Sequence, residues 1–199
     1  MLAAGTQAAT ACHHMRNSLR CTAVAFVVGL ASVVAMPTAA LAGGYLGLAL
    51  SSEGDIGKNA QTGGTIGTRK AISVGQRWRM LSAEVNLSGF DARLFYQEYS
   101  GFALGAAARL SVPVFPLLHV FGQGGVEYTD LNAKKDTVPD LSGTQLVLGA
   151  GAELKVSLLA SGSVYAGYFV RTGELSYSDR ATKFAADHGQ FALGVTLGF

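Results

Sequence analysis

The last ten residues, Gln190 to Phe199 (QFALGVTLGF), alternate without a break between apolar side chains and small or polar ones. The apolar face carries Phe191, Leu193, Val195, Leu197 and Phe199. About ten residues with this period-two pattern are what a tilted strand needs to cross a bilayer with its apolar face toward lipid. A strand of a soluble β-sandwich alternates in the same way, so this segment alone leaves both interpretations open.

The other end of the chain has the features of a secretory signal peptide. Arg16 and Arg20 precede an apolar stretch from Cys21 to Ala35, and a run of small residues ends at Ala42. The apolar stretch is shorter than the roughly 20 residues that a membrane-spanning helix needs. We therefore predict that residues 1–42 are an N-terminal extension and signal peptide, cleaved after Ala42, and that residues 43–199 are exported.

Met15 stands directly before this basic region and is the expected initiator, which makes the residues before it an upstream extension. Both cysteines, Cys12 and Cys21, lie in the removed part, so a disulfide, a cysteine metal site and a lipid anchor are not expected in the exported domain. Loss of Arg16 and Arg20 reduces the 15 basic residues to 13, which balance the 13 acidic ones. A neutral domain offers no electrostatic basis for binding nucleic acid.

Eight candidate strands follow one another in the exported domain, and their connections alternate between long and short. The strands are Gly44–Ser52, Arg69–Trp78, Leu81–Gly89, Gly101–Val112, Leu117–Tyr128, Thr144–Leu154, Gly162–Arg171 and Gly189–Phe199. Barrels of the outer membrane have long external loops, short periplasmic turns and an even number of strands. A soluble sandwich has no reason to sort its loops by length in this way. The sequence therefore predicts an all-β fold, an eight-stranded antiparallel up-and-down transmembrane β-barrel.

The faces of the strands predict which side chains point inward. In the sixth strand Leu146 and Leu148 stand opposite Gly149, Gly151 and Glu153. The interior of an eight-stranded barrel is just wide enough for side chains to fill, so small residues and a few long polar ones fit the inward face. We therefore predict a structural polar network in the lumen, formed by Arg77, Glu84, Arg109, Glu127, Glu153 and Arg171.

Three segments resemble the small OmpA/OmpX-like outer-membrane barrels. Residues 149–168 (GAGAELKVSLLASGSVYAGY) are similar to a Gly-x-Gly-x-Glu strand, short turn and Tyr-ending strand of that family, and residues 75–90 (GQRWRMLSAEVNLSGF) are similar to its second and third strands. A strand that closes on a terminal aromatic, here Phe199, resembles the family's C-terminal assembly signal. The chain departs from the family at Gly167, where relatives often carry an inward acid. The resemblance implies residence in the outer membrane and recognition of the last strand by the barrel-assembly machinery.

The lumen charges have two interpretations. In the first they form a structural plug, because buried ions need partners. In the second they line a narrow gated ion path. Glu84 and Arg109 are expected at similar depth on adjacent strands, where they can face each other.

The sequence gives little support for catalysis or for metal binding. A hydrolase needs a nucleophile, a base and an orienting acid in close contact, whereas the exported domain has two histidines, His119 and His188. Ser178 and Asp179 near His188 are the one candidate grouping for a lipid A-modifying enzyme. Neither a cofactor nor a metal ion is expected, and the protein is predicted not to be an enzyme.

The predicted second loop carries the clearest candidate contact residues, Arg93, Phe95, Tyr96 and Tyr99. Rigid amphipathic rings next to charges are typical of binding surfaces, although the same rings also fit extensions of the strands. The sequence thus predicts a monomeric, noncatalytic outer-membrane protein whose four loops contact lipopolysaccharide, a host surface or an envelope partner. A small gated channel is the alternative.

Overall fold

The structure is a computed structural model that describes residues 42–56, 63–135, 137–156, 162–179 and 182–199. The strands are β1 (Ala42–Ser51), β2 (Gly54–Ile56), β3 (Gly64–Ile66), β4 (Arg69–Trp78), β5 (Leu81–Leu94), β6 (Gln97–Pro113), β7 (Leu118–Ala133), β8 (Leu141–Val156), β9 (Gly162–Tyr177), β10 (Lys183–Ala185) and β11 (His188–Gly198). No helix long and apolar enough to span a membrane occurs in these ranges. Apart from Ala42, the predicted signal peptide lies outside the described residues, so its cleavage stays a prediction.

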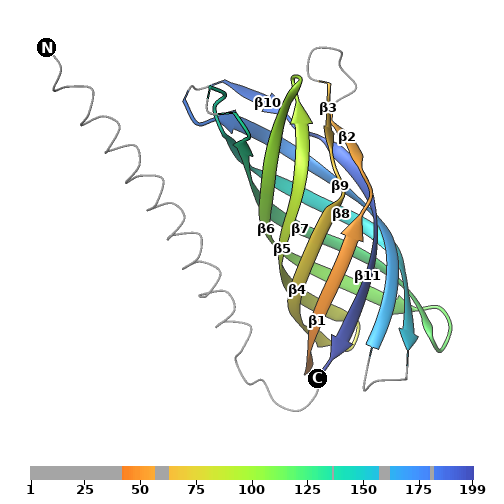
Figure 1. Ribbon diagram of the computed structural model, residues 1–199. Helices are drawn as coiled ribbons and strands as arrows, with labels where there is room; N and C mark the ends of the chain where they lie inside the picture. Colours follow the sequence, from red (N-terminus) through yellow and green to blue (C-terminus); the bar gives the residue numbers. More distant parts are fainter. Residues whose placement is uncertain (1–41, 57–62, 136, 157–161, 180–181) are drawn as a thin grey trace, which may run out of the picture. The chain divides into compact units, whose positions relative to one another are not determined.

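Eight long strands close into an antiparallel barrel (Figure 1). Each is hydrogen-bonded to the next along the chain, and β11 returns to β1, where Leu46 pairs with Leu197 and Leu50 with Leu193. The amide of Phe199 donates to the carbonyl of Gly44 across 2.8 Å, which brings both ends of the barrel to one rim. The short strands β2, β3 and β10 extend the opposite rim. The predicted fold class is confirmed.

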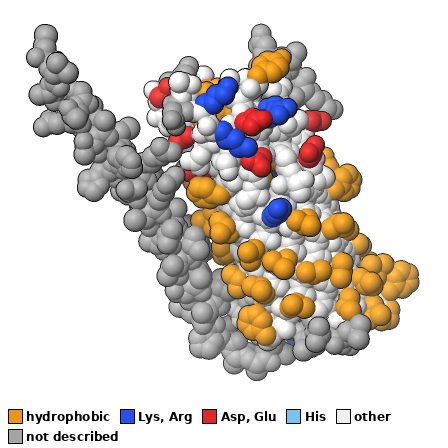
Figure 2. Space-filling view, in the orientation of Figure 1, with side chains coloured by type: hydrophobic (Ala, Val, Ile, Leu, Met, Phe, Trp, Pro, Cys, Tyr) orange, Lys and Arg blue, Asp and Glu red, His pale blue; other side chains and the backbone are white. Residues whose placement is uncertain are grey.

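A band of exposed apolar side chains surrounds the barrel. It includes residues on every long strand, among them Leu48, Ile72, Leu87, Leu148 and Leu193. Leu193 has a relative exposure of 66%. In Figure 2 these side chains cover the lower part of the visible face, whereas charged side chains gather above them. Contiguous apolar surface of this extent is typical of contact with lipid rather than with water.

Strand β5 shows how the barrel changes above this band. Its odd-numbered residues, apart from the buried Val85, are exposed or partly exposed, and they change from Leu81 and Leu87 to Asp91 and Arg93. The inward side changes in the opposite sense, from polar Glu84 to buried apolar residues. These belong to an apolar core inside the outer end of the barrel, formed by Ile56, Ile66, Phe90, Ala92, Leu94, Tyr99, Ala103, Leu131, Leu141, Leu175 and Ala186. Within the apolar band the interior therefore holds buried charged side chains, whereas above the band the interior is apolar.

The strand bounds above the apolar band correct the predicted loop boundaries. Residues 90–100, expected to be a long loop, continue β5 and β6 in register, so that Ala92 pairs with Tyr99 and Leu94 with Gln97. The connection is a two-residue turn, in which Phe95 and Tyr96 have φ of 51° and 64°. Left-handed conformation at both central residues is typical of type I′ hairpin turns. The loops after β7 and β9 are likewise shorter than predicted, because those strands extend beyond the apolar band.

Candidate functional site

Polar side chains fill the lumen within the apolar band in three clusters, each built around one glutamate. The lower cluster lies nearest the rim at which β1 begins and β11 ends. Its carboxylate, on Glu153, is fully buried and accepts hydrogen bonds from Arg77 (2.8 Å), Lys155 (2.9 Å) and Ser163 (2.5 Å). Arg77 comes from β4 and Ser163 from β9, so the cluster connects strands that are not neighbours. The side chains of Arg77 and Lys155 keep exposures of 22% and 25% at this mouth of the barrel.

The middle cluster is built around Glu84 on β5. The hydroxyl of Tyr45 and the amide of Gln123 donate to its carboxylate across 2.7 and 2.9 Å, and a guanidinium nitrogen of Arg109 lies 3.6 Å from it. Arg109 also donates to Gln123 across 3.0 Å. Its guanidinium lies 4.5 and 4.7 Å from the ring centroids of Phe121 and Tyr165. These rings, with Val147, Phe169 and Ala192, form a second apolar cluster in the lumen.

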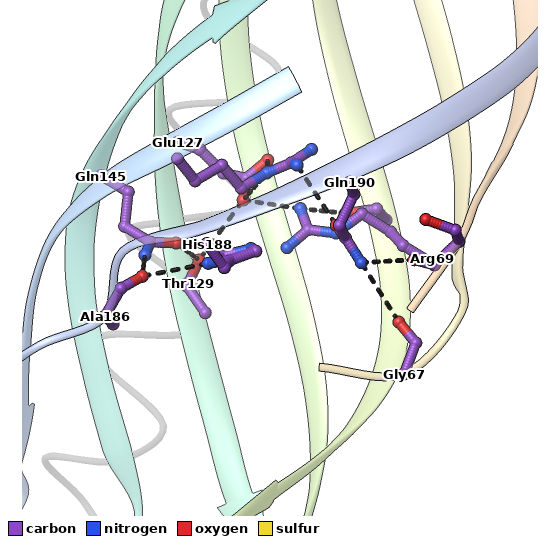
Figure 3. Close-up of polar contacts among 11 residues, drawn as sticks. Gly67, Arg69, Glu127, Thr129, Gln145, Ala186, His188 and Gln190 are labelled. Carbon is purple, nitrogen blue, oxygen red and sulfur yellow. Dashed lines mark hydrogen bonds and ion pairs between the residues drawn. The ribbon is translucent and has the colours of Figure 1, made fainter. Parts of the chain in front are cut away.

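The upper cluster is built around Glu127 on β7 (Figure 3). Arg69 on β4 donates to its carboxylate across 2.6 Å and Arg171 on β9 across 3.2 Å. Arg171 also donates to the side-chain oxygen of Gln190 across 3.2 Å, and the amide of Gln190 donates to the carbonyl of Ser52 across 2.7 Å. The cluster thereby connects the long strands to the segment that follows β1.

Further bonds tie the upper cluster to the segment before β11. The amide of Gln145 donates to the carbonyl of Ala186 across 2.9 Å, and its oxygen accepts from Thr129 across 3.2 Å. The Nδ1 atom of His188 lies 3.0 Å from the same carbonyl of Ala186. His188 is thus a buried member of the lumen, whereas Ser178 and Asp179 are exposed.

The structure places all six predicted lumen residues inside the barrel. Glu84 meets Arg109, Arg77 meets Glu153, and Glu127 meets Arg171. Sequence reasoning missed Arg69, which shares the inward parity of Arg77 on the same strand and was recognisable by that signal. It also missed the uncharged or peripheral partners Tyr45, Gln123, Gln145, Lys155, His188 and Gln190.

A cavity of about 60 Å³ lies between the middle and upper clusters. It is bordered by the charged side chains Arg69, Glu84, Arg109, Glu127 and Arg171. The apolar core that contains Leu131 and Leu141 lies on its outer side, and both of these residues are fully buried. Within the described residues, no group of three or more His, Cys, Asp or Glu side chains is arranged to hold a metal ion.

The predicted loop residues have different environments. Tyr99 is buried in the apolar core, so it does not offer its ring to an external partner, which corrects that prediction. Phe95 packs edge-on against Phe184 with ring centroids 5.3 Å apart. Tyr96, at the hairpin tip, is 97% exposed. Arg93 points outward and donates to Glu98 across 3.0 Å; this bond, with the charge of Lys134, holds the pKa of Glu98 below its ordinary 4.5.

The last strand presents its apolar residues to the outside. Phe191, Leu193, Val195 and Leu197 are exposed on the outer surface of β11, and Phe199 is exposed directly after it, while Gln190, Ala192 and Thr196 are buried on the inner side. The five residues of the expected assembly signal therefore form one lipid-facing stripe that ends at the rim. Recognition of this stripe by assembly machinery stays a prediction.

No protein-family model matches the sequence, and the search of curated proteins gives no match. Solved structures do match the fold. The Neisserial surface protein A (NspA) is 13% identical with a TM-score of 0.64, and the match covers 78% of this chain and 97% of that chain. The N-terminal barrel of Pseudomonas aeruginosa OprF is 12% identical with a TM-score of 0.56, covering 79% and 97%. The outer membrane protein AlkL is 10% identical with a TM-score of 0.51, covering 83% and 94%. The chain therefore has the fold of the small eight-stranded outer-membrane β-barrels.

Proposed function

We propose that this protein is a noncatalytic integral protein of the bacterial outer membrane, exported through the periplasm, whose barrel anchors a strand-built extracellular extension. The observation that carries the proposal is the filled lumen. An apolar core occupies the outer end, and ion pairs around Glu127, Glu84 and Glu153 lie below it, leaving a cavity of only about 60 Å³ between the middle and upper clusters. A barrel filled in this way acts as an anchor, and its outer surface is left for interaction.

The filled lumen supports the anchor over the gated channel. Ion passage requires the buried ion pairs to separate and, at the same time, the apolar side chains of Leu131, Leu141 and Leu175 to move out of the path. Refolded protein in planar bilayers is expected to give no discrete conductance. The matched variant Arg109→Gln opens one ion pair without adding bulk and is expected to stay silent as well. Steps of conductance that change with this substitution would instead establish the channel.

We propose lipopolysaccharide as one partner of the outer surface, through Lys70. This residue is exposed, pairs between Leu50 and Gly89, and marks the upper limit of the apolar band. It makes no ion pair with any described residue, whereas Lys183 lies 3.5 Å from Glu174. A free ammonium at the level of lipid headgroups suits a phosphate.

The lipopolysaccharide contact is tested with two lysine variants. Folded protein in vesicles with and without lipopolysaccharide is compared by its thermal unfolding midpoint. Lys70→Gln is expected to lose the stabilisation that lipopolysaccharide gives, and Lys183→Gln is expected to keep it. If lipopolysaccharide shifted the unfolding midpoint of both variants equally, Lys70 would not be the contact.

A protein or host-surface partner is proposed for the hairpin tip. Tyr96 offers a whole aromatic ring to solvent from a left-handed backbone conformation, and strained residues of this kind concentrate at functional sites. A deletion strain that carries either the wild-type protein or Tyr96→Ser separates adhesion from the anchor role. Loss of adhesion with intact envelope integrity is expected for Tyr96→Ser. Unchanged adhesion would leave the anchor role without this contact.

A further inference from the structure

The charges around the lumen cavity do not balance. Three arginines, Arg69, Arg109 and Arg171, border it together with two glutamates, Glu84 and Glu127. Arg109 lies 3.6 Å from Glu84, while Arg69 and Arg171 share Glu127 at 2.6 and 3.2 Å. Three positive charges minus two negative ones leave an excess of one. Arginine does not release its proton in proteins, so the excess persists at every physiological pH.

Solvent does not reach this excess charge. The side chains of Arg69, Arg109 and Arg171 are 1%, 2% and 9% exposed, and the apolar core lies between them and the outside. The lower cluster also has two cations for one acid, but there Arg77 and Lys155 are partly open to water at the mouth of the barrel. A buried charge without a partner is costly, whereas a solvated one is not. The imbalance in the upper lumen therefore calls for a counter-charge.

Hydrogen-bond donors in the same place lack partners. The Nε and Nη2 atoms of Arg69 and the Nη1 atom of Arg109 are buried and make no hydrogen bond to any described residue. The ring of Phe90 lies 4.3 Å from the guanidinium of Arg69, but a stacked ring covers the face of the group. The N–H donors lie in the guanidinium plane. Ring stacking therefore leaves them available.

We propose that the lumen cavity binds one small monovalent inorganic anion of the halide class, held by Arg69, Arg109 and Arg171. The single excess charge matches a monovalent ion. The volume of about 60 Å³ is several times the roughly 10 to 15 Å³ that one water molecule requires, so an ion and a few waters fit. The site is a structural anion site inside the plug, and it does not depend on any partner of the outer surface.

The test compares refolding in different sodium salts. Refolding in each salt exposes the cavity to the anion while the barrel closes, so the chain is refolded in chloride, bromide or gluconate at equal ionic strength. Chloride and bromide are expected to raise the thermal unfolding midpoint in a saturable way, as a ligand of the folded state does. Gluconate is too large for the cavity and gives the baseline. Crystals grown in bromide are expected to show an anomalous peak beside Arg69.

Two variants connect the effect to the cavity. Arg171→Gln removes the excess charge and leaves the Arg69 to Glu127 pair intact, and Arg69→Gln leaves the Arg171 to Glu127 pair, so at least one is expected to fold. Either variant is expected to unfold at the same temperature in chloride and gluconate. Arg93→Gln on the outer surface is the control and keeps the chloride effect.

Equal midpoints of the wild-type protein in chloride and gluconate would overturn the site. So would an unchanged chloride effect in a folded Arg171→Gln or Arg69→Gln variant, because the anion would then act elsewhere. A cavity that holds water without anomalous density in bromide crystals would also overturn it.

Discussion

Arg69 and Glu127 meet across the lumen, with the Nη1 and Oε1 atoms 2.6 Å apart, and join β4 to β7, two strands that share no ladder. Both side chains are almost completely buried. The pair therefore connects separate parts of the wall through the interior, in addition to the hydrogen bonds that close the barrel around its circumference. Stability of the barrel is expected to depend on such pairs as well as on the ladders.

Replacement of Glu127 tests the energetic role of the upper cluster. Glu127→Leu leaves Arg69 and Arg171 buried without an acid, and we expect the free energy of unfolding to fall by about 3 to 5 kcal/mol. Urea unfolding in detergent micelles measures the loss. Glu98→Gln removes an exposed pair on the outer surface and is expected to change stability far less, because solvent screens exposed ion pairs. Similar losses for both variants would contradict a special role for the buried pair.

The orientation of the strands is tested on the lipid face. Leu148 is exposed within the apolar band, and Leu148→Arg is expected to destabilise the barrel by about 2 to 4 kcal/mol in lipid. Asn86 borders the lumen cavity, and Asn86→Ser is expected to be nearly neutral. Reversed effects would mean that the register is wrong by one residue, because such a shift turns every side chain to the other face.

The lumen does not tolerate every small substitution. A side chain at Gly149 would meet the buried ring of Phe169, because a Cβ atom there would lie 2.3 Å from a ring carbon. Gly149→Ser is therefore expected to destabilise for steric reasons, whereas Gly122→Ser on β7, with nothing within 4 Å of its Cβ position, is expected to be tolerated. Refolding yield and unfolding midpoint distinguish the two variants. Equal tolerance would contradict the packing around Phe169.

The hairpin tip carries conformational strain that a substitution can relieve. Tyr96 has φ of 64° and is almost fully exposed, so its ring contributes little packing. Asparagine adopts this conformation more readily, and Tyr96→Asn is expected to stabilise the protein by about 1 kcal/mol. The same change at Tyr99 removes a buried ring from the apolar core and is expected to destabilise. A destabilising Tyr96→Asn would show that the ring makes contacts that the structure does not contain.

The outer surface predicts a pH effect at Glu98. The hydrogen bond from Arg93 and the charge of Lys134 lower the pKa of this carboxyl below 4.5. A lowered pKa means that the pairing contributes above about pH 4.5 and is lost as the pH falls through the shifted value. NMR titration of the carboxyl carbon is expected to give a pKa that rises toward 4.5 in Arg93→Gln. An identical titration in both proteins would exclude the pair in solution.

Deletion of Phe199 separates stability from assembly. The residue is exposed at the rim, so its loss is expected to cost at most about 1.5 to 3 kcal/mol, the transfer value of one such side chain. The truncated protein is expected to refold in detergent almost normally but to accumulate poorly in the outer membrane of cells. Membrane levels equal to those of the full-length protein would contradict the role of Phe199 as an assembly signal and leave the barrel standing.

The sequence predicts the barrel well because period-two alternation within the apolar band is strong on β1, β5, β6, β8 and β11. It fails above the band, at residues 90–100, because there the outward side becomes charged and the inward side apolar, a pattern that resembles a polar loop with stray aromatics. The lumen residues are predictable by parity, and Arg69 shares the parity of Arg77. The partner of each lumen residue cannot be predicted in this way, because the pairing of Arg69 with Glu127 depends on strand stagger across the barrel rather than on spacing along the chain.

The barrel has a lipid-facing band whose interior holds the buried charges and, above it, a water-facing band with an apolar interior. Spin labels placed one at a time along β5, from Leu81 to Leu94, test this arrangement most directly, with Cys12 and Cys21 replaced by serine and the protein in lipid vesicles. Odd-numbered positions other than the buried Val85 are expected to be accessible, to oxygen as far as Leu87 and to a water-soluble nickel complex from Asp91 onward. Even-numbered positions are expected to be protected from both reagents. Accessible even-numbered positions, or alternation that is lost after Gly89, would contradict the account.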